Sequence, residues 1–214
     1  MPRLALALVL LWFLALFVVR TLIQWRRTGS TGLKGFHGRI GSLPWSAGAS
    51  VSLGVLLALA APVAAWLGWP GGSLLVSSAP LHVAGAFLLV GGMLGALGAQ
   101  LTMGDSWRVG VDETERTELV TTGLFAWVRN PIFTFMGISL LGLMGLVPNV
   151  ASLAAGALTL LGIELQVRFV EEPWLARAHG ARYRAYAGRT GRFLPGIGRI
   201  AHREEGAAGG PAQR

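Results

Sequence analysis

Five long apolar stretches constrain the fold of this chain of 214 residues more than any other feature. A membrane-spanning helix needs roughly 20 apolar residues, within a range of about 17–25. Each stretch is close to that length, although the fourth is marginal. The stretches are Leu4–Val19, Ser46–Gly68, Leu81–Thr102, Pro131–Val147 and Val150–Val170. We therefore expect an all-α polytopic membrane helix bundle with about five transmembrane helices, followed by a C-terminal cytoplasmic interfacial helical segment.

The composition supports a membrane location. Hydrophobic residues make up 53% of the chain and charged residues 13%, whereas soluble domains carry about 25% charged residues. The chain has no cysteine, which excludes disulfides, thiolate metal sites and a cysteine nucleophile. The four histidines show no metal-binding spacing, so we expect no metal site. No small-x-small cleavage site precedes Arg20, so we expect a retained first helix rather than a signal peptide.

The distribution of basic residues predicts the orientation of the helices. The formal net charge is +8, and because the bases flank apolar spans, membrane lipids are the expected partner and nucleic acid is not. Segments 20–39, 103–130 and 171–199 are basic, while segments 69–80 and 148–149 are neutral. Since Lys and Arg are retained in the cytoplasm, the N-terminus is expected outside and the C-terminus inside. The excess of Arg over Lys indicates a bacterial source, and hence a bacterial plasma membrane.

Glycines in the third apolar stretch predict close packing of helices. Gly91 and Gly95 form a small-xxx-small pair, which lets helix backbones approach each other. The same glycines superficially suggest a nucleotide-binding loop, but no strand precedes them and the surrounding stretch is apolar. We therefore interpret them as packing residues.

The segment Leu119–Pro131 places polar groups where a membrane helix should begin. Pro131 can start a helix without losing a hydrogen bond, because the first N–H groups of a helix are unpaired. These N–H groups, together with Arg129, would suit a carboxylate or a phosphate. The alternative is that Arg129 only reaches lipid headgroups.

A second polar cluster ends the fifth stretch on the same predicted face. Charge at Glu171 and Glu172 is costly at this depth unless it has a use, and Pro173 is expected to break or restart the helix there. The two carboxylates would accept hydrogen bonds from hydroxyls or from an amine. Glu164 precedes Arg168 by four residues, the favourable order for a helical ion pair.

The following stretch, Pro173–Pro195, mixes aromatic and basic residues, and Gly180 and Gly188 are expected to divide it into short pieces. One interpretation is a segment that lies on anionic lipid. The other is a lid whose aromatic rings cover a flat or cationic ligand. The residues alone leave both interpretations open.

In their order along the chain, these residues resemble the isoprenylcysteine carboxyl methyltransferase family and the related phospholipid methyltransferases. The family motif runs approximately L-V-T-x-G, then R-H-P, a helical hairpin, E-E, and a C-terminal aromatic segment that ends in proline. The matching residues are Leu119, Val120, Thr121, Gly123, Phe125, Arg129, Asn130, Pro131, Phe133, Glu171, Glu172, His179, Gly180, Tyr183, Tyr186, Phe193, Leu194 and Pro195. The resemblance extends over roughly residues 98–195, almost half of the chain.

The resemblance implies an integral membrane methyltransferase that uses S-adenosylmethionine. The implied acceptor is lipophilic: an isoprenylcysteine-like carboxylate, another small lipophilic molecule, or a lipidated substrate. Arg129 and Glu171 are the implied catalytic residues. The residues implied to bind the cofactor are Arg129, Asn130, Pro131, Glu171, Glu172, Trp174, Tyr183 and Tyr186. Asn130 stands where the family has a His, and an amide cannot titrate near neutral pH.

The resemblance also divides the chain into three parts. Residues 1–80 form the N-terminal membrane helices with a basic loop, residues 81–200 form the methyltransferase-like core, and residues 201–214 form a polar tail that we expect to be disordered. Two other functions are compatible with the sequence. One is an NADPH-dependent membrane reductase of the sterol-reductase type, and the other is a non-enzymatic membrane subunit or carrier.

Overall fold

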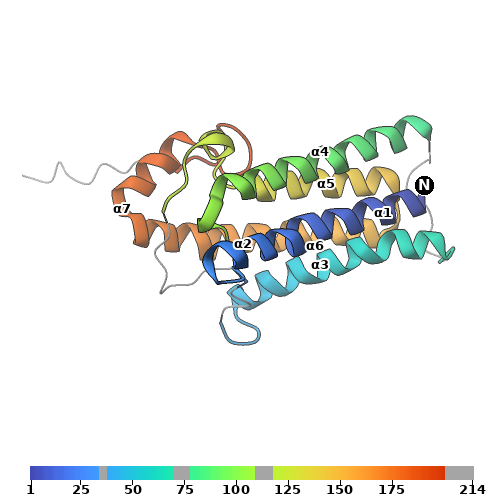
Figure 1. The fold of residues 1–214 in the computed structure, drawn as a ribbon, viewed down its shortest axis with the longest axis horizontal. Helices are drawn as coiled ribbons and strands as arrows, with labels where there is room; N and C mark the ends of the chain where they lie inside the picture. Colours follow the sequence, from blue (N-terminus) through green and yellow to red (C-terminus); the bar gives the residue numbers. More distant parts are fainter. Residues whose placement is uncertain (34–37, 70–77, 109–117, 201–214) are drawn as a thin grey trace, which may run out of the picture.

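The described part of the chain is built from helices and the segments that connect them (Figure 1). The computed structural model describes residues 1–33, 38–69, 78–108 and 118–200. Within these residues there are two isolated β-bridges and no strand, so the predicted all-α class is confirmed. The tail 201–214, predicted to be disordered, lies outside the described residues, as do Lys34 and Arg116.

The helices follow the predicted apolar stretches. The first rod consists of α1 (Pro2–Phe13), the π-helical turn η1 (Leu14–Val19) and α2 (Arg20–Thr28). Next come α3 (Leu43–Trp66) and α4 (Ala79–Met103), followed by the short 3₁₀ turns η2 (Gly104–Ser106) and η3 (Gly123–Ala126). The chain then forms α5 (Pro131–Leu146), α6 (Val150–Gln166), the π-helical turn η4 (Val167–Glu171) and α7 (Glu172–Arg189).

Four of these rods are long and apolar enough to cross a membrane: Pro2–Thr28, Leu43–Trp66, Ala79–Ser106 and Val150–Arg189. The remaining apolar helix, α5, has 16 residues and a length of about 24 Å, less than the roughly 30 Å of a hydrocarbon core. The predicted count of five spans therefore stays a prediction for α5.

Local sequence explains where two helices begin. α5 begins at Pro131, as predicted, since proline fits the first helical position. α6 begins after Asn149, whose side-chain oxygen accepts a hydrogen bond from the Ser152 N–H (2.9 Å), while Ser152 Oγ accepts one from the Asn149 N–H (3.2 Å). This reciprocal capping box satisfies two N–H groups that a helix start leaves unpaired.

The first rod is longer than predicted. Segment 20–39 was expected to be a loop, but its first nine residues form α2. Arg20 is buried, donates hydrogen bonds to Gln24 (2.9 Å) and to the Gly104 carbonyl, and stacks on Trp107 at 4.5 Å. A cation with these partners continues a helix instead of ending it, and it ties α2 to the turn after α4.

Pro173 was predicted to break or restart the helix. It does not break it, but the α-helix resumes at Glu172 with Pro173 in the first turn of α7. α6 continues through η4 into α7. A proline ring clashes with the carbonyl one turn earlier, and here the widened π turn lies immediately before it, which is one way a helix accommodates such a residue. The break occurs instead at Gly180, whose φ is +53°. Gly188 lies within regular helix.

Two helix pairs make up the bundle, with α4 packed on α5 and α3 packed on α6, while α1 contacts α3, α4 and α5 (Figure 1). At the α4–α5 contact, a Cβ on Gly92 would lie 2.6 Å from the Phe135 carbonyl oxygen, whereas nothing lies within 4 Å of a Cβ on Gly91. Gly95 packs against the Phe135 ring. The predicted close packing is thus confirmed for Gly95. The prediction is wrong for Gly91, and its neighbour Gly92 lies at the helix contact instead.

Candidate functional site

The structure brings the two predicted polar clusters together at the end of the bundle where α5 begins. The Arg129 guanidinium bonds Glu172 Oε1 through Nη2 (2.6 Å) and Nε (3.2 Å). The Arg129 and Glu172 side chains are only 2% and 9% exposed. Residues 43 positions apart thus form a buried ion pair between the start of α5 and the start of α7.

A second base shares the same carboxylate. Arg192 donates from Nε to Glu172 Oε1 (2.9 Å) and from Nη2 to Oε2 (2.7 Å). These hydrogen bonds raise the pKa of Arg192 above its ordinary value. In the sequence, Arg192 is one of several bases in the segment 171–199 and indicates only the orientation in the membrane, because no spacing distinguishes it from the others.

The segment after α7, residues 190–200, folds back over the start of α5. The Arg129 N–H donates to the Gly191 carbonyl (2.8 Å), and the Asn130 N–H and side-chain amide both donate to the Arg192 carbonyl (3.1 and 3.2 Å). Thr134 Oγ1 donates to the Phe193 carbonyl (2.8 Å). Asn130 therefore fastens this C-terminal strap (residues 190–200) through hydrogen bonds that need no titratable ring.

All five N–H donors of the Arg129 guanidinium are used inside the protein. Two bond Glu172, and the other three bond the carbonyls of Ala187 (3.1 Å), Thr190 and Gly198 (2.9 Å). A guanidinium has five donors in total. In this structure Arg129 therefore braces α5, α7 and the C-terminal strap, and it has no N–H left for a ligand.

A large cavity, which we call the main cavity, opens beside this brace. Its volume is about 640 Å³, within the range of about 300–1,000 Å³ that is usual for ligand pockets. One end is polar, and the residues there that the sequence predicted as site residues are Arg129, Asn130, Glu171, Glu172, Trp174, Tyr183 and Tyr186. Pro131 is fully buried beside them at the helix start.

Glu171 differs from its neighbour. It lines the main cavity, and the hydrogen bond described for it comes from Gln166 Nε2 at 3.4 Å. Its neighbour Glu172 instead receives four donor atoms from two guanidinium groups. Of the two adjacent acids, Glu171 is therefore the one with acceptor capacity left for a ligand.

The predicted aromatic residues face inward. Trp174, Tyr183 and Tyr186 are buried and line the main cavity. Arg108 stacks on the Trp174 ring at 4.6 Å, and the Tyr186 hydroxyl donates to the Phe125 carbonyl (2.6 Å). The Tyr183 hydroxyl has no hydrogen-bond partner within the described part of the chain.

The other end of the main cavity is apolar and runs into the bundle. Its walls come from α1 and η1, from one face of α3, and from the first turns of α5. The apolar lining residues are Phe13, Phe17, Val51, Val55, Leu56, Leu59, Ile132, Phe133, Met136 and Ile163. The main cavity thus joins a charged, aromatic opening to an apolar interior. Such a cavity suits one polar and one apolar ligand, or a single amphiphilic ligand.

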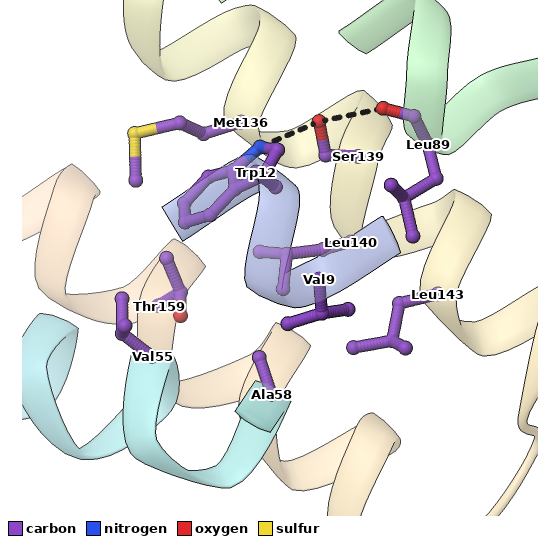
Figure 2. A pocket seen from close by; sticks show the side chains of 10 residues that line it. All are labelled: Val9, Trp12, Val55, Ala58, Leu89, Met136, Ser139, Leu140, Leu143 and Thr159. Atoms are coloured by element: carbon purple, nitrogen blue, oxygen red, sulfur yellow. Dashed lines mark hydrogen bonds between the residues drawn. The ribbon is translucent and has the colours of Figure 1, made fainter. Parts of the chain in front are cut away.

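A second, smaller cavity of about 30 Å³ lies in the middle of the bundle (Figure 2). We call it the inner cavity. Trp12 lies at its wall, and the indole N–H donates to Ser139 Oγ (3.1 Å), whose hydroxyl contacts the Leu89 carbonyl (3.5 Å) (Figure 2). The same hydroxyl lies 3.0 Å from the Phe135 carbonyl. The polar edge of the indole is thereby satisfied within an apolar surround.

Comparison with known proteins adds the family to this geometry. Residues 80–182 match the family model described as phospholipid methyltransferase. The matched segment is just under half of the chain. The resemblance inferred from the motifs is thereby confirmed, and the family implies a methyltransferase in a membrane. A comparison with the curated proteins found no match.

The phospholipid methyltransferase segment coincides with only part of the site. It contains α4, α5, α6 and the first half of α7, and therefore Arg129, Glu171, Glu172 and Trp174. Tyr183, Tyr186 and Arg192 follow it, and α1 and α3 precede it. Much of the apolar wall of the main cavity thus comes from helices outside the matched segment. The match and the four long apolar helices both support an integral membrane protein.

Proposed function

We propose that the protein transfers the methyl group of S-adenosylmethionine to a lipophilic acceptor at the cytoplasmic face of a bacterial plasma membrane. The observation that carries the proposal is the main cavity, whose polar mouth and apolar interior are continuous. A hydrophilic donor and a lipophilic acceptor would meet in such a hollow. The family match supports methyl transfer as the reaction, and the basic segments support an outside N-terminus and an inside C-terminus.

The residues at the mouth suit the methyl donor. Glu171 has acceptor capacity for hydroxyls or an amino group, the unpartnered Tyr183 hydroxyl is a donor and an acceptor, and Trp174 offers an aromatic ring. The donors of Arg129 are occupied, so in this proposal Arg129 and Glu172 organise the site. The carboxylate of the methyl donor would instead be held by the unpaired N–H groups of the first turn of α5.

When bound, S-adenosylmethionine supplies an electrophilic methyl group. The protein contributes binding and orientation, which can supply on the order of 7–11 kcal/mol of barrier reduction. An acceptor carboxylate or thiolate is already nucleophilic, so no strong base is required. The Asn130 amide, which cannot take up a proton near neutral pH, is compatible with this chemistry.

The test is calorimetric titration of the purified protein in detergent with S-adenosylhomocysteine. We expect saturable binding, and we expect Glu171→Gln to raise Kd about tenfold or more, because a hydrogen bond to a charged group is worth about 1.5–3 kcal/mol. Glu164→Gln is the matched control. Glu164 lies on the same rod two turns earlier, pairs with Arg168 and does not line the main cavity, so its Kd should equal that of the unmodified protein.

Two results would overturn the proposal. Saturable binding of NADPH without binding of S-adenosylhomocysteine would establish a reductase of the sterol-reductase type. Failure to bind either molecule would favour a non-enzymatic membrane subunit or carrier.

A further inference from the structure

The inner cavity continues the main cavity toward the opposite end of the bundle. The lining is displaced in this direction along the first rod, α4, α5 and α6, whereas on α3 the two linings overlap between Val55 and Leu59. On the first rod the lining moves from Phe17 and Phe13 to Trp12 and Val9, and on α6 it moves from Gln166 and Ile163 to Thr159. The two hollows are therefore consecutive compartments of one path through the bundle.

α5 gives the scale of this path. The main cavity reaches Met136, five residues or about 7.5 Å beyond Pro131, and the inner cavity extends to Leu143, about 18 Å beyond Pro131. Met136 and Val55 line both compartments. These two side chains consequently form the partition between them.

The wall behind the partition is mainly apolar, and its side-chain hydroxyls are those of Ser139 and Thr159. Trp12 is 8% exposed, and its hydrogen bond to Ser139 fixes the orientation of the indole (Figure 2). With a volume near 30 Å³, the inner cavity has room for a water, but a buried water needs two to four polar partners. Ser139 is already bonded to Trp12 and to the Phe135 carbonyl, which leaves the Thr159 hydroxyl as the unpartnered side-chain group among the described lining residues. An apolar group is therefore the occupant that its chemistry favours.

We propose that Met136 and Val55, supported by Trp12, set the length of the apolar chain that the acceptor can carry. The inference rests on the proposed methyl transfer to a lipophilic acceptor and adds a specificity to it. A chain that enters from the main cavity ends against the partition, and a longer chain must displace it. Trp12 and Val55 precede residues 80–182 and Met136 lies within them, so this selectivity combines the matched segment with helices outside it.

The experiment measures methyl transfer from radiolabelled S-adenosylmethionine to a homologous series of N-acetyl-S-(n-alkyl)cysteines. Met136→Ala joins the two compartments, so we expect the preferred chain to lengthen. For chains beyond the preferred length of the unmodified protein, kcat/KM should rise about fourfold for each methylene newly buried. Val55→Ala opens the partition from α3 at a smaller cost to the core and should shift the preference in the same direction.

Met93→Ala is the matched control. Met93 is 8% exposed and belongs to the same packed cluster as Met136 and Trp12, but it lines neither cavity. Its substitution should lower stability to a comparable extent and leave the length preference unchanged. A preference that shifts equally in Met93→Ala would show general loosening of the core and would overturn the inference.

A direct readout uses the same alkyl series with a terminal bromine, which quenches tryptophan emission at short range. Chains of the preferred length should quench a component of the emission that is missing in Trp12→Phe. If the unmodified protein methylates the series but both partition variants keep its length profile, the inference fails and the proposed function stands. If the unmodified protein methylates no member of the series, the inference fails for this class of acceptor, and if it also binds no S-adenosylhomocysteine, the proposed function fails as well.

Discussion

Arg129 illustrates how a motif residue acquires its role from its partners. Its guanidinium is buried, and its five donors bond a carboxylate and three backbone carbonyls of a segment about 60 residues later. A buried charge is stable only when it is paired and its hydrogen bonds are satisfied. Arg129 thereby makes the fold of the C-terminal strap depend on the start of α5.

At this scale we predict that Arg129→Met lowers the free energy of unfolding by about 3–5 kcal/mol, because Glu172 would keep a buried charge with one partner removed. Thermal or chemical unfolding in detergent measures the loss. Arg129→Lys should restore only part of it, since an ammonium cannot reproduce the planar fork.

Arg168→Met is the control for Arg129→Met. Arg168 pairs with Glu164, but the two side chains are 50% and 42% exposed, and exposed pairs are worth about 0–1 kcal/mol. Equal losses in Arg129→Met and Arg168→Met would contradict the buried brace.

Single residues were only partly predictable from the sequence. The family motif linked Arg129 to the acidic pair, and the structure places them in contact. The motif did not predict that Glu172 would be saturated while Glu171 keeps acceptor capacity, because the phase of a helix decides which of two adjacent acids turns toward the bases. The same reason explains Gly91 and Gly92, which are neighbours in sequence and face different directions.

Among the secondary-structure elements, the α4–α5 contact gives the sharpest prediction. Gly92→Ala would place a Cβ 2.7 Å from the Ser139 backbone nitrogen, so the two helices must separate. We expect the free energy of unfolding to fall by about 1–3 kcal/mol, the usual cost of overpacking a core. A lower melting temperature in detergent would measure this loss.

Gly91→Ala provides the comparison within the same helix turn. Its Cβ would meet nothing within 4 Å, and alanine favours a helix over glycine by about 0.8–1.0 kcal/mol. Gly91→Ala should therefore be neutral or slightly stabilising. A larger loss in Gly91→Ala than in Gly92→Ala would contradict the packing described here.

Element boundaries were predictable where local chemistry decides them. Pro131 starts α5, and the hairpin turn before Val150 is fixed by a capping box. Boundaries decided by distant partners were not predictable. Arg20 appeared to end the first helix because it is charged, but Gly104 and Trp107, more than 80 residues later, give it a buried environment. Pro173 appeared to break a helix that a π turn keeps continuous.

For the whole molecule, the orientation in the membrane is a prediction that the absence of native cysteine makes easy to test. When the protein carries a single introduced cysteine and is expressed in cells, Ala79→Cys at the start of α4 should react with a membrane-impermeant maleimide while the cells are intact. Arg199→Cys in the C-terminal strap should react only after permeabilisation. Both positions are exposed, and the expected sides follow from the retention of basic segments in the cytoplasm.

The same labelling also tests whether the short helix α5 crosses the bilayer. Three crossings by α4, α5 and α6 put the two positions on opposite sides. Labelling of both from the same side would show that α5 does not cross, and the reversed pattern would show the opposite orientation.

The helical class was predictable from hydropathy. The meeting of the two polar clusters was predictable from the family motif that contains both of them. The cavities were not, because their walls combine side chains from helices far apart in sequence, and an apolar residue that lines a cavity looks the same in sequence as one that fills a core.

Up to the kink at Gly180, the rod that begins at Val150 is helical and would measure about 45 Å if it were straight, more than the roughly 30 Å thickness of a hydrocarbon layer. One end of this rod is embedded among lipid tails, and the other carries Glu171 and Trp174. A bilayer that thins or thickens has to tilt or shift the rod as a unit. The proposed methyl transfer is therefore expected to respond to the acyl-chain length of the host lipids, because the helix between Val150 and the kink at Gly180 moves as one body.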